Sequence, residues 1–310
     1  SFQSKYLGMS AWECPAAFSM IAYVEHKYGI YHVIGGINKI SEAMAEVAIK
    51  EGAKINLGKK VIKILNQGKK AIGLVLEDGR EVFADYIIVN SDFSYSVLNL
   101  MDKYYLKKYS EENLAKKKYS CSTFMLYLCV NKLYDIPHHN IVFASDYKQN
   151  VNDIFKNQRL SKEISFYLQN PSVSDPTLAP EGKSSVYVLV PVPNLRANID
   201  WIREKENFKE KVLDQIEKRT EMKDIRENIL DYLIITPKDW EEKYNVYLGA
   251  TFNLGHNLSQ MLYFRPHNEF ECLENVYLVG GGTHPGSGLP MIYQSAKISA
   301  ELICKKEGKV

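Results

Sequence analysis

A run of glycines marks the part of this chain best suited to bind a ligand. Gly280, Gly281 and Gly282 follow a continuous apolar run at 275–279 and lead through further small residues to an expected helix at about 290–305. Because glycine has no Cβ, such a run permits a tight turn and leaves backbone amides exposed. The helix that follows presents its positive end, which can hold an anionic or electron-rich group. The pattern predicts a cofactor site, with a purely structural turn as the alternative.

The glycine run differs from the dinucleotide-binding fingerprint. Its spacing is not GxGxxG, and no second strand with an acidic ribose ligand follows the helix. We therefore expect the strand at 275–279 to complete a sheet that begins elsewhere. Ser287 lies between two glycines, but the sequence has no GxSxG nucleophile motif, which argues against a serine hydrolase.

Neither the histidines nor the cysteines predict a metal site. The seven histidines are dispersed, and the adjacent pair His138 and His139 has no helical partner or nearby carboxylate, so a solvated loop is expected there. The five cysteines are widely separated and form no paired spacing. This pattern favours reduced thiols in a cytosolic protein.

Composition argues against two further classes of protein. The 39 lysines and arginines nearly balance the 37 aspartates and glutamates and are scattered, so we expect no cationic face for nucleic acid. No run approaches the ~18 to 20 apolar residues that span a bilayer. Any membrane contact is therefore expected to be peripheral.

Several elements must position the glycine run. Apolar residues at helical spacing predict a helix over 37–50, and short β-type runs separated by Gln-Gly and Asp-Gly pairs predict a β-meander over 61–83. A continuous apolar run at 86–89 has the pattern of a strand buried on both faces. It ends at Asn90 and Ser91, which are well placed to meet a ligand.

The sequence pattern changes over the stretch from about 93 to 256, which indicates an inserted second domain. Charged helical stretches such as 205–223 alternate with β-rich runs at 124–130, 165–168 and 186–192. Prolines, Pro191 among them, are expected in loops because they cannot lie inside a central sheet. The chain is thus expected to be of the α/β class with an inserted α+β domain.

The order of these elements resembles the FAD-binding domain of the glutathione-reductase-like flavoproteins, in the branch of amine oxidases and carotenoid desaturases. Residues 277–290 are similar to the C-terminal signature of bacterial phytoene desaturases, in which Ala usually stands where this chain has Gly281. The stretches at 2–8, 175–182, 187–193 and 264–268 are also similar to that family. Residues 119–122 resemble its dehydrosqualene branch.

The resemblance implies a division of the chain into functional parts. Residues 1–33 would belong to the substrate or helical domain, 34–92 and 257–310 to the FAD-binding domain, and 93–256 to the substrate-binding domain. The GxGxxG unit with which this family begins is missing from the sequence. The chain alone is therefore expected to bind FAD poorly and to be inactive, and no catalytic acid or base is assigned.

The resemblance also implies which residues approach FAD. The backbone of Gly281, Gly282 and Thr283 would face the pyrophosphate and ribityl part. The residues expected to face the isoalloxazine form the start of the last helix: Pro290, Met291 and Ile292.

A second group of residues would lie at the other end of the cofactor. Val61 occupies the family position whose backbone contacts adenine, with strand core as its alternative role. Asn90 and Ser91 would flank the same end, although Asn90 also suits a simple turn. His284 is expected to be structural or a neighbour of the cofactor. Arg265, together with His267, is considered as a polar link between domains.

The implied activity is FAD-dependent desaturation of a C30 or C40 carotenoid precursor such as dehydrosqualene or phytoene. The flavin would accept a hydride from the lipophilic polyene, and quinone or oxygen would then accept the electrons. Aromatic-rich runs at 124–127 and 166–168 are candidates for an apolar substrate tunnel, with ordinary core as their alternative. Phe18, Met20, Ile21 and Tyr23 are candidates for docking on a membrane from the cytoplasm, with packed core as their alternative.

Three alternatives stay open. The chain is also compatible with a retinol saturase-like flavin oxidoreductase or an amine oxidase. It is equally compatible with a truncated fragment that binds lipid without catalysis.

Overall fold

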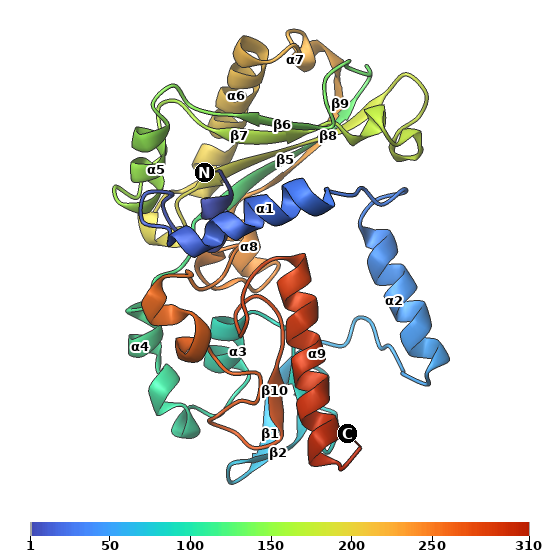
Figure 1. Cartoon of the computed structure of the whole chain (residues 1–310), viewed down its shortest axis with the longest axis vertical. Coiled ribbons are helices and arrows are strands. Elements are labelled where there is room, and N and C mark those ends of the chain that lie inside the picture. Colours follow the sequence, from blue (N-terminus) through green and yellow to red (C-terminus); the bar gives the residue numbers. More distant parts are fainter. Residues whose placement is uncertain (1, 310) are drawn as a thin grey trace. The chain divides into compact units, whose positions relative to one another are not determined.

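The computed structural model describes residues 2–309, which divide into two compact units (Figure 1). Unit 1 comprises Ser1–Cys14, Leu57–Cys121 and Asp239–Val310, and unit 2 comprises Pro15–Asn56 and Ser122–Lys238. The two units therefore alternate along the sequence, and each is assembled from segments that are distant in the chain.

These units do not coincide with the predicted functional parts. Residues 34–56 lie in unit 2, because the buried carboxylate of Asp175 accepts a hydrogen bond from the Gly35 amide and pairs with His32, both at 2.8 Å. Residues 93–121 and 239–256 lie in unit 1, where the Ser120 amide donates to the Asn253 carbonyl at 2.9 Å. The division into FAD-binding and substrate-binding parts stays a prediction.

Unit 1 contains two small sheets and several helices. Its β-meander has the predicted antiparallel order β1-β2-β3, and the second sheet pairs β4 with β10 in parallel. Its strands and α-helices are β1 (Val61–Gln67), β2 (Lys70–Leu76), β3 (Glu81–Phe83), β4 (Ile87–Val89), α3 (Phe93–Asn99), α4 (Glu111–Ala115), β10 (Val276–Leu278) and α9 (Leu289–Lys306), and α8 (Pro237–Glu242) crosses into it from unit 2.

Its short 3-10 helices are η1 (Phe2–Leu7), η3 (Lys103–Tyr105), η4 (Lys107–Tyr109), η8 (Tyr247–Gly249), η9 (Leu258–Gln260) and η10 (Leu262–Phe264). The core of the unit gathers side chains from β4, β10, α3 and the segments that flank them.

The expectation that the strand at 86–89 is buried on both faces is wrong. Ile87 and Val89 are buried in the core of unit 1, but Ile88 is 54% exposed. Side chains alternate between the two faces of a strand, so Ile88 points to the opposite face of β4. Within residues 2–309, no layer of side chains covers Ile88 on that face.

Helix α9 approaches β10 through two serines that lie one turn apart. Ser295 and Ser299 are buried, and the Ser299 hydroxyl donates to the Leu278 carbonyl at 2.8 Å. These two small side chains allow the helix to approach the strand closely. Ala296 and Ala300 are exposed because they lie on another face of the helix.

Unit 2 is built on a five-stranded antiparallel sheet in the order β6-β7-β8-β5-β9. Helix α6 packs Phe208, Val212 and Ile216 against one face of this sheet and forms a core with its side chains. The strands and α-helices of the unit are α1 (Ser19–Tyr28), α2 (Asn38–Lys50), β5 (Ser122–Val130), β6 (His139–Val142), α5 (Tyr147–Phe155), β7 (Phe166–Gln169), β8 (Ser184–Val192), α6 (Trp201–Arg219), α7 (Ile225–Asn228) and β9 (Ile229–Ile235).

Its 3-10 helices are η2 (Ala16–Phe18), η5 (Pro171–Val173), η6 (Pro176–Leu178) and η7 (Leu195–Ala197). The predicted helix at 37–50 is confirmed as α2, although none of its residues is buried.

The expectation that Pro191 lies in a loop is wrong. It is part of β8, an interior strand of the sheet, and pairs with Thr123 of β5. On the opposite side, β7 pairs with β8 only from Tyr187 to Leu189. Pro191 lies beyond that register, so it has no partner in β7.

Candidate cofactor site

The parallel pairing of β4 and β10 brings two polar loops together. The Val279 amide donates to the Val89 carbonyl at 3.0 Å, and both strands then end at the same edge. A Cβ on Gly280 would lie 3.1 Å from the Asn90 side-chain oxygen. Ligands of open α/β sheets bind at this carboxyl edge of the strands.

The glycine run lies directly against the start of α3. A Cβ on Gly282 would lie only 2.6 Å from the Cβ of Phe93. A Cβ on Gly281 would meet Ser287 Oγ at 3.1 Å, which is the end of a short side chain that can rotate. Backbone can therefore approach backbone at Gly282 in a way that no other residue type allows.

Of the predicted site residues, Ser91 and Thr283 form hydrogen bonds to other residues of the protein through their side chains. The Ser91 hydroxyl is bonded to the Ser96 hydroxyl at 2.6 Å. Thr283 is buried, and its hydroxyl donates to the Pro266 carbonyl at 2.6 Å. Any contact of Thr283 with a ligand must therefore come from its backbone.

The remaining predicted residues lie farther along the chain. Pro290 and Met291 are exposed in the first turn of α9, and Ile292 is half-buried. Val61 opens β1 and pairs with Leu76 in the meander, which is a separate sheet from β4 and β10. The structure thus brings together Asn90, Ser91 and the glycine run.

The guanidinium group of Arg265 holds the glycine run from inside unit 1. Its Nη2 donates to the Gly281 carbonyl at 2.6 Å and its Nε donates to the Thr283 carbonyl at 3.0 Å. Burial lowers the pKa of Arg265 to about 10, so the group stays charged at neutral pH. The partners of this side chain all lie in unit 1, although Leu254 belongs to the predicted substrate-binding part, so a link between the two functional parts stays a prediction.

His256 fixes the second half of the loop in its neutral form. The Ser287 amide donates to its Nε2 at 3.2 Å, so Nδ1 carries the proton and donates to the Leu7 carbonyl at 3.0 Å. Burial, followed by the nearby charge of Arg265, lowers the pKa of His256 to about 4. A Cβ on Gly286 would lie 2.5 Å from His256 Nε2, so this contact requires glycine.

Sequence reasoning assigned no role to His256. A single histidine without a spaced partner gives no local signal, and its partners Leu7 and Ser287 lie at opposite ends of the sequence. Arg265 lies in a stretch that resembles the desaturase family, which was the signal that could have placed it near the glycine run.

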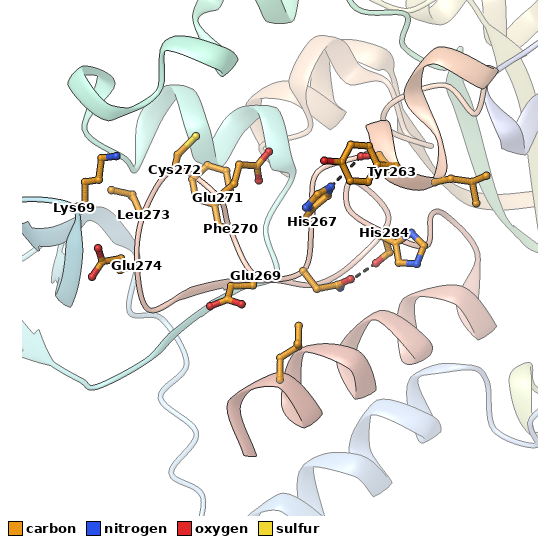
Figure 2. A pocket seen from close by; sticks show the side chains of 13 residues that line it. Lys69, Tyr263, His267, Glu269, Phe270, Glu271, Cys272, Leu273, Glu274 and His284 are labelled. Atoms are coloured by element: carbon orange, nitrogen blue, oxygen red, sulfur yellow. Dashed lines mark hydrogen bonds between the residues drawn. The ribbon is translucent and has the colours of Figure 1, made fainter. Parts of the chain in front are cut away.

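A cavity of about 810 Å³ lies in unit 1 (Figure 2). His284 and Asn268 line it, and the Asn268 amide donates to the His284 carbonyl at 3.0 Å. None of the nine predicted cofactor residues lines this cavity. Its other polar walls are contributed by Lys69, His267, Glu269, Glu271 and Glu274. Among the residues that the structure describes, no cluster of acidic, histidine or cysteine side chains could hold a metal ion.

The glycine run fits a phosphate-bearing cofactor. Within residues 2–309, the amides of Gly281 and Gly282 donate to no other group of the protein. Free amides that follow a strand can bind anionic oxygens. A parallel strand pair that ends in such a loop, beside a β-meander, defines a nucleotide-cofactor protein of the α/β class.

The chain belongs to the flavin-containing amine oxidoreductase family, whose model matches residues 2–304. It is 54% identical over 305 residues to a 4,4'-diapophytoene desaturase (4,4'-diapolycopene-forming) of Methylomonas sp, covering 98% of this chain and 60% of that protein. It is 36% identical to an all-trans-zeta-carotene desaturase of Myxococcus xanthus, covering 100% of this chain and 59% of that protein. The chain thus spans about three fifths of the length of these relatives.

Solved structures agree in fold. An oxidoreductase from Methanosarcina mazei superposes with a TM-score of 0.60 at 18% identity, covering 86% of this chain and 55% of that chain. The expected amine-oxidase-like α/β fold and the carotenoid desaturase resemblance are confirmed. The cofactor of this family is a flavin, as its name states.

The close approach at Gly282 predicts a difference between two neighbouring glycines. Gly282→Ala should lower the free energy of unfolding by about 1–3 kcal/mol, because its Cβ would overlap Phe93. Gly281→Ala is the matched control, and its free energy of unfolding should stay within about 1 kcal/mol of that of the unsubstituted chain. Urea unfolding of the three proteins measures this, and equal losses in both variants would contradict the geometry.

The neutral state of His256 predicts a pH dependence. Its pKa is about 4 when folded and about 6.5 when unfolded. Between these values the unfolded chain binds more protons, so stability from this group falls as the pH decreases through the window. As the pH falls through this range, the free energy of unfolding of the unsubstituted chain should decrease by on the order of 3 kcal/mol more than that of His256→Gln.

Urea unfolding of both proteins across this pH window tests the prediction. Asp92 acts in the opposite direction, since burial raises its pKa to about 6. Asp92 is present in both proteins, so its effect cancels in the difference between them. A difference that does not change with pH would show that His256 is not held neutral.

Proposed function

We propose that the protein of which this chain is part is an FAD-dependent desaturase that introduces double bonds into 4,4'-diapophytoene. The observation that carries this proposal is the 54% identity to a diapophytoene desaturase across 98% of the chain. The identity to the zeta-carotene desaturase is lower, at 36%. This difference favours a C30 over a C40 substrate.

The glycine run supports a role in holding FAD. The free amides of Gly281 and Gly282 would bind the pyrophosphate and the start of the ribityl chain. The Asn90 side chain, which the sequence predicts to flank the adenine end, would lie beside them because it is next to Gly280. Thr283 and Ser91 would contribute through their backbones, and Pro290, Met291 and Ile292 would face the isoalloxazine. Val61 is proposed to contact adenine. When bound, the flavin supplies the two-electron oxidation that turns a carbon–carbon single bond into a double bond.

The sheet of unit 2 offers an aromatic face that suits a polyene. The two faces differ, because Phe124, Phe166 and Leu168 are fully buried in the core under α6. Tyr127, Tyr187 and Tyr167 lie on the opposite face and form a continuous row, with ring centroids 5.8 and 5.5 Å apart.

The next strand extends this aromatic face. Leu233 of β9 pairs with Tyr127 and is 57% exposed. A C30 hydrocarbon carries no polar group, so contact with apolar and aromatic surface must supply its affinity. The proposed substrate-lining side chains are therefore those of the tyrosine row and Leu233, and the buried parts of 124–127 and 166–168 are core.

The proposal predicts which substrate the whole protein converts. Expressed with the rest of its gene in cells that accumulate either 4,4'-diapophytoene or phytoene, it should desaturate the C30 compound at least about tenfold faster, a ratio that corresponds to 1.4 kcal/mol. Chromatography of the extracted pigments gives the product ratio. If FAD-loaded protein converts only the C40 compound, or neither compound, the substrate assignment is contradicted.

A matched pair of variants keeps this test specific. Leu233→Asp places a charge on the aromatic face and should lower conversion while FAD stays bound. Ile202→Asp changes an exposed residue of α6, on the other side of the sheet, and should leave conversion unchanged. Quinone and oxygen are the proposed electron acceptors, and anaerobic assays with and without added quinone distinguish them.

We further propose that α1 docks the protein peripherally on a membrane, at its cytoplasmic face. Met20 and Tyr23 of this helix are 66% and 56% exposed, whereas Phe18 and Ile21 are half-buried. Lys27 lies 5.4 Å from the ring centroid of Tyr23. Exposed aromatic and basic residues on a helix are typical of binding at a lipid interface. No helix among the described residues is long and apolar enough to cross a bilayer.

Flotation with lipid vesicles tests this docking. The whole protein should float with vesicles that contain anionic lipid, and the double variant Met20→Asp, Tyr23→Asp should lose about tenfold in partitioning, because two apolar contacts are removed. Ile202→Asp serves as the control, since it changes an exposed apolar residue elsewhere. Loss of flotation in the control, or none in the double variant, would refute a role for α1.

A further inference from the structure

We propose that Arg265 is a positioning residue that keeps the Gly282 amide turned toward the cofactor and supplies a buried positive charge that favours the reduced, more negative flavin. This inference rests on the proposed function, because it assumes that FAD lies at the glycine run. It gives a specific role to a residue that the sequence predicts only as a polar link between domains.

The contacts of the guanidinium are all made to neutral oxygens. Besides the Gly281 and Thr283 carbonyls, Nη2 donates to the Leu254 carbonyl at 3.3 Å and Nη1 donates to the Gln260 carbonyl at 3.5 Å. The side chain is 1% exposed. The planar fork of arginine suits this arrangement, because its donors diverge at fixed angles.

Peptide geometry links these contacts to the outer side of the loop. In a trans peptide unit, the carbonyl and the following amide point in opposite directions. Because Arg265 draws the Gly281 carbonyl inward, the Gly282 amide must point away from the guanidinium. That amide has no partner among the described residues, so it is available to an anionic ligand.

The charge of Arg265 is not neutralised within the described part of the chain. No carboxylate lies within ion-pair distance of its guanidinium there. His256, which also holds the loop, is neutral and adds no charge. A buried charge without a counter-ion is costly to the fold. An anionic ligand at the glycine run would offset that cost, and more so when the ligand gains negative charge on reduction.

Three variants of the whole, FAD-loaded protein separate positioning from charge. Arg265→Lys keeps the charge but loses the fork, so FAD should bind about tenfold more weakly while its reduction potential stays unchanged. Arg265→Gln loses both the positive charge and the planar fork of donors. Its preference for reduced over oxidised FAD should fall about tenfold, which lowers the potential by about 30 mV. Arg80→Gln, which removes an exposed arginine of the meander, should change neither quantity.

The measurements are flavin titration, thermal unfolding and spectroelectrochemistry with a reference dye. A folded Arg265→Gln protein with unchanged FAD affinity and potential would make Arg265 a purely structural residue and overturn the inference. If this variant does not fold, Arg265→Lys decides, because unchanged FAD affinity there would also overturn it. Failure of the unsubstituted whole protein to bind FAD would refute the proposed function instead.

Discussion

The pairing of β4 with β10 is the interaction on which the candidate site depends. These two short strands are separated by almost two hundred residues in the chain and meet in parallel over three residue pairs. Asn90 and the glycine run become neighbours only because both strands end at the same edge. Two groups from unit 1 then fix the loop, with Arg265 binding its first carbonyls and His256 accepting from its Ser287 amide. Because the loop consists largely of glycine, its conformation is determined by the residues that bind it from outside.

The two faces of the sheet in unit 2 differ: one packs into the core, and the other carries a row of tyrosine rings. Alternation along β5, β7 and β8 sends one set of side chains into a tightly packed core with α6. The other set forms the row of tyrosine rings, with Leu233 beside it. An apolar composition alone does not distinguish these two faces. Only the register between strands assigns Phe124 to the core and Tyr127 to the face that is proposed to meet a substrate.

Local signals made much of this architecture predictable from the sequence. The helix at 37–50, the meander, the strands on either side of the insertion and the final helix follow from periodicity and turn residues close together in the chain. The errors have a common physical cause. The exposure of Ile88 and the place of Pro191 inside a sheet depend on which neighbours a strand acquires, which the local sequence does not specify. His256 acts through Leu7 and Ser287, which are distant from it in sequence, so its role could not be predicted from local patterns. Arg265 acts through nearby backbone carbonyls whose direction only the folded loop determines.

The alternation of the two units along the chain has a consequence for synthesis on the ribosome. Every segment of unit 2 lies before residue 239, so its sheet can close, and His32 can reach Asp175 across 143 residues, while the last segment of unit 1 has yet to emerge. Unit 1 cannot do the same, because β4 must wait for β10. At about 5–20 residues per second, the ribosome takes roughly 10 to 40 s to synthesise the segment between β4 and β10. During that interval β4 lacks β10, the strand with which it pairs in the folded unit.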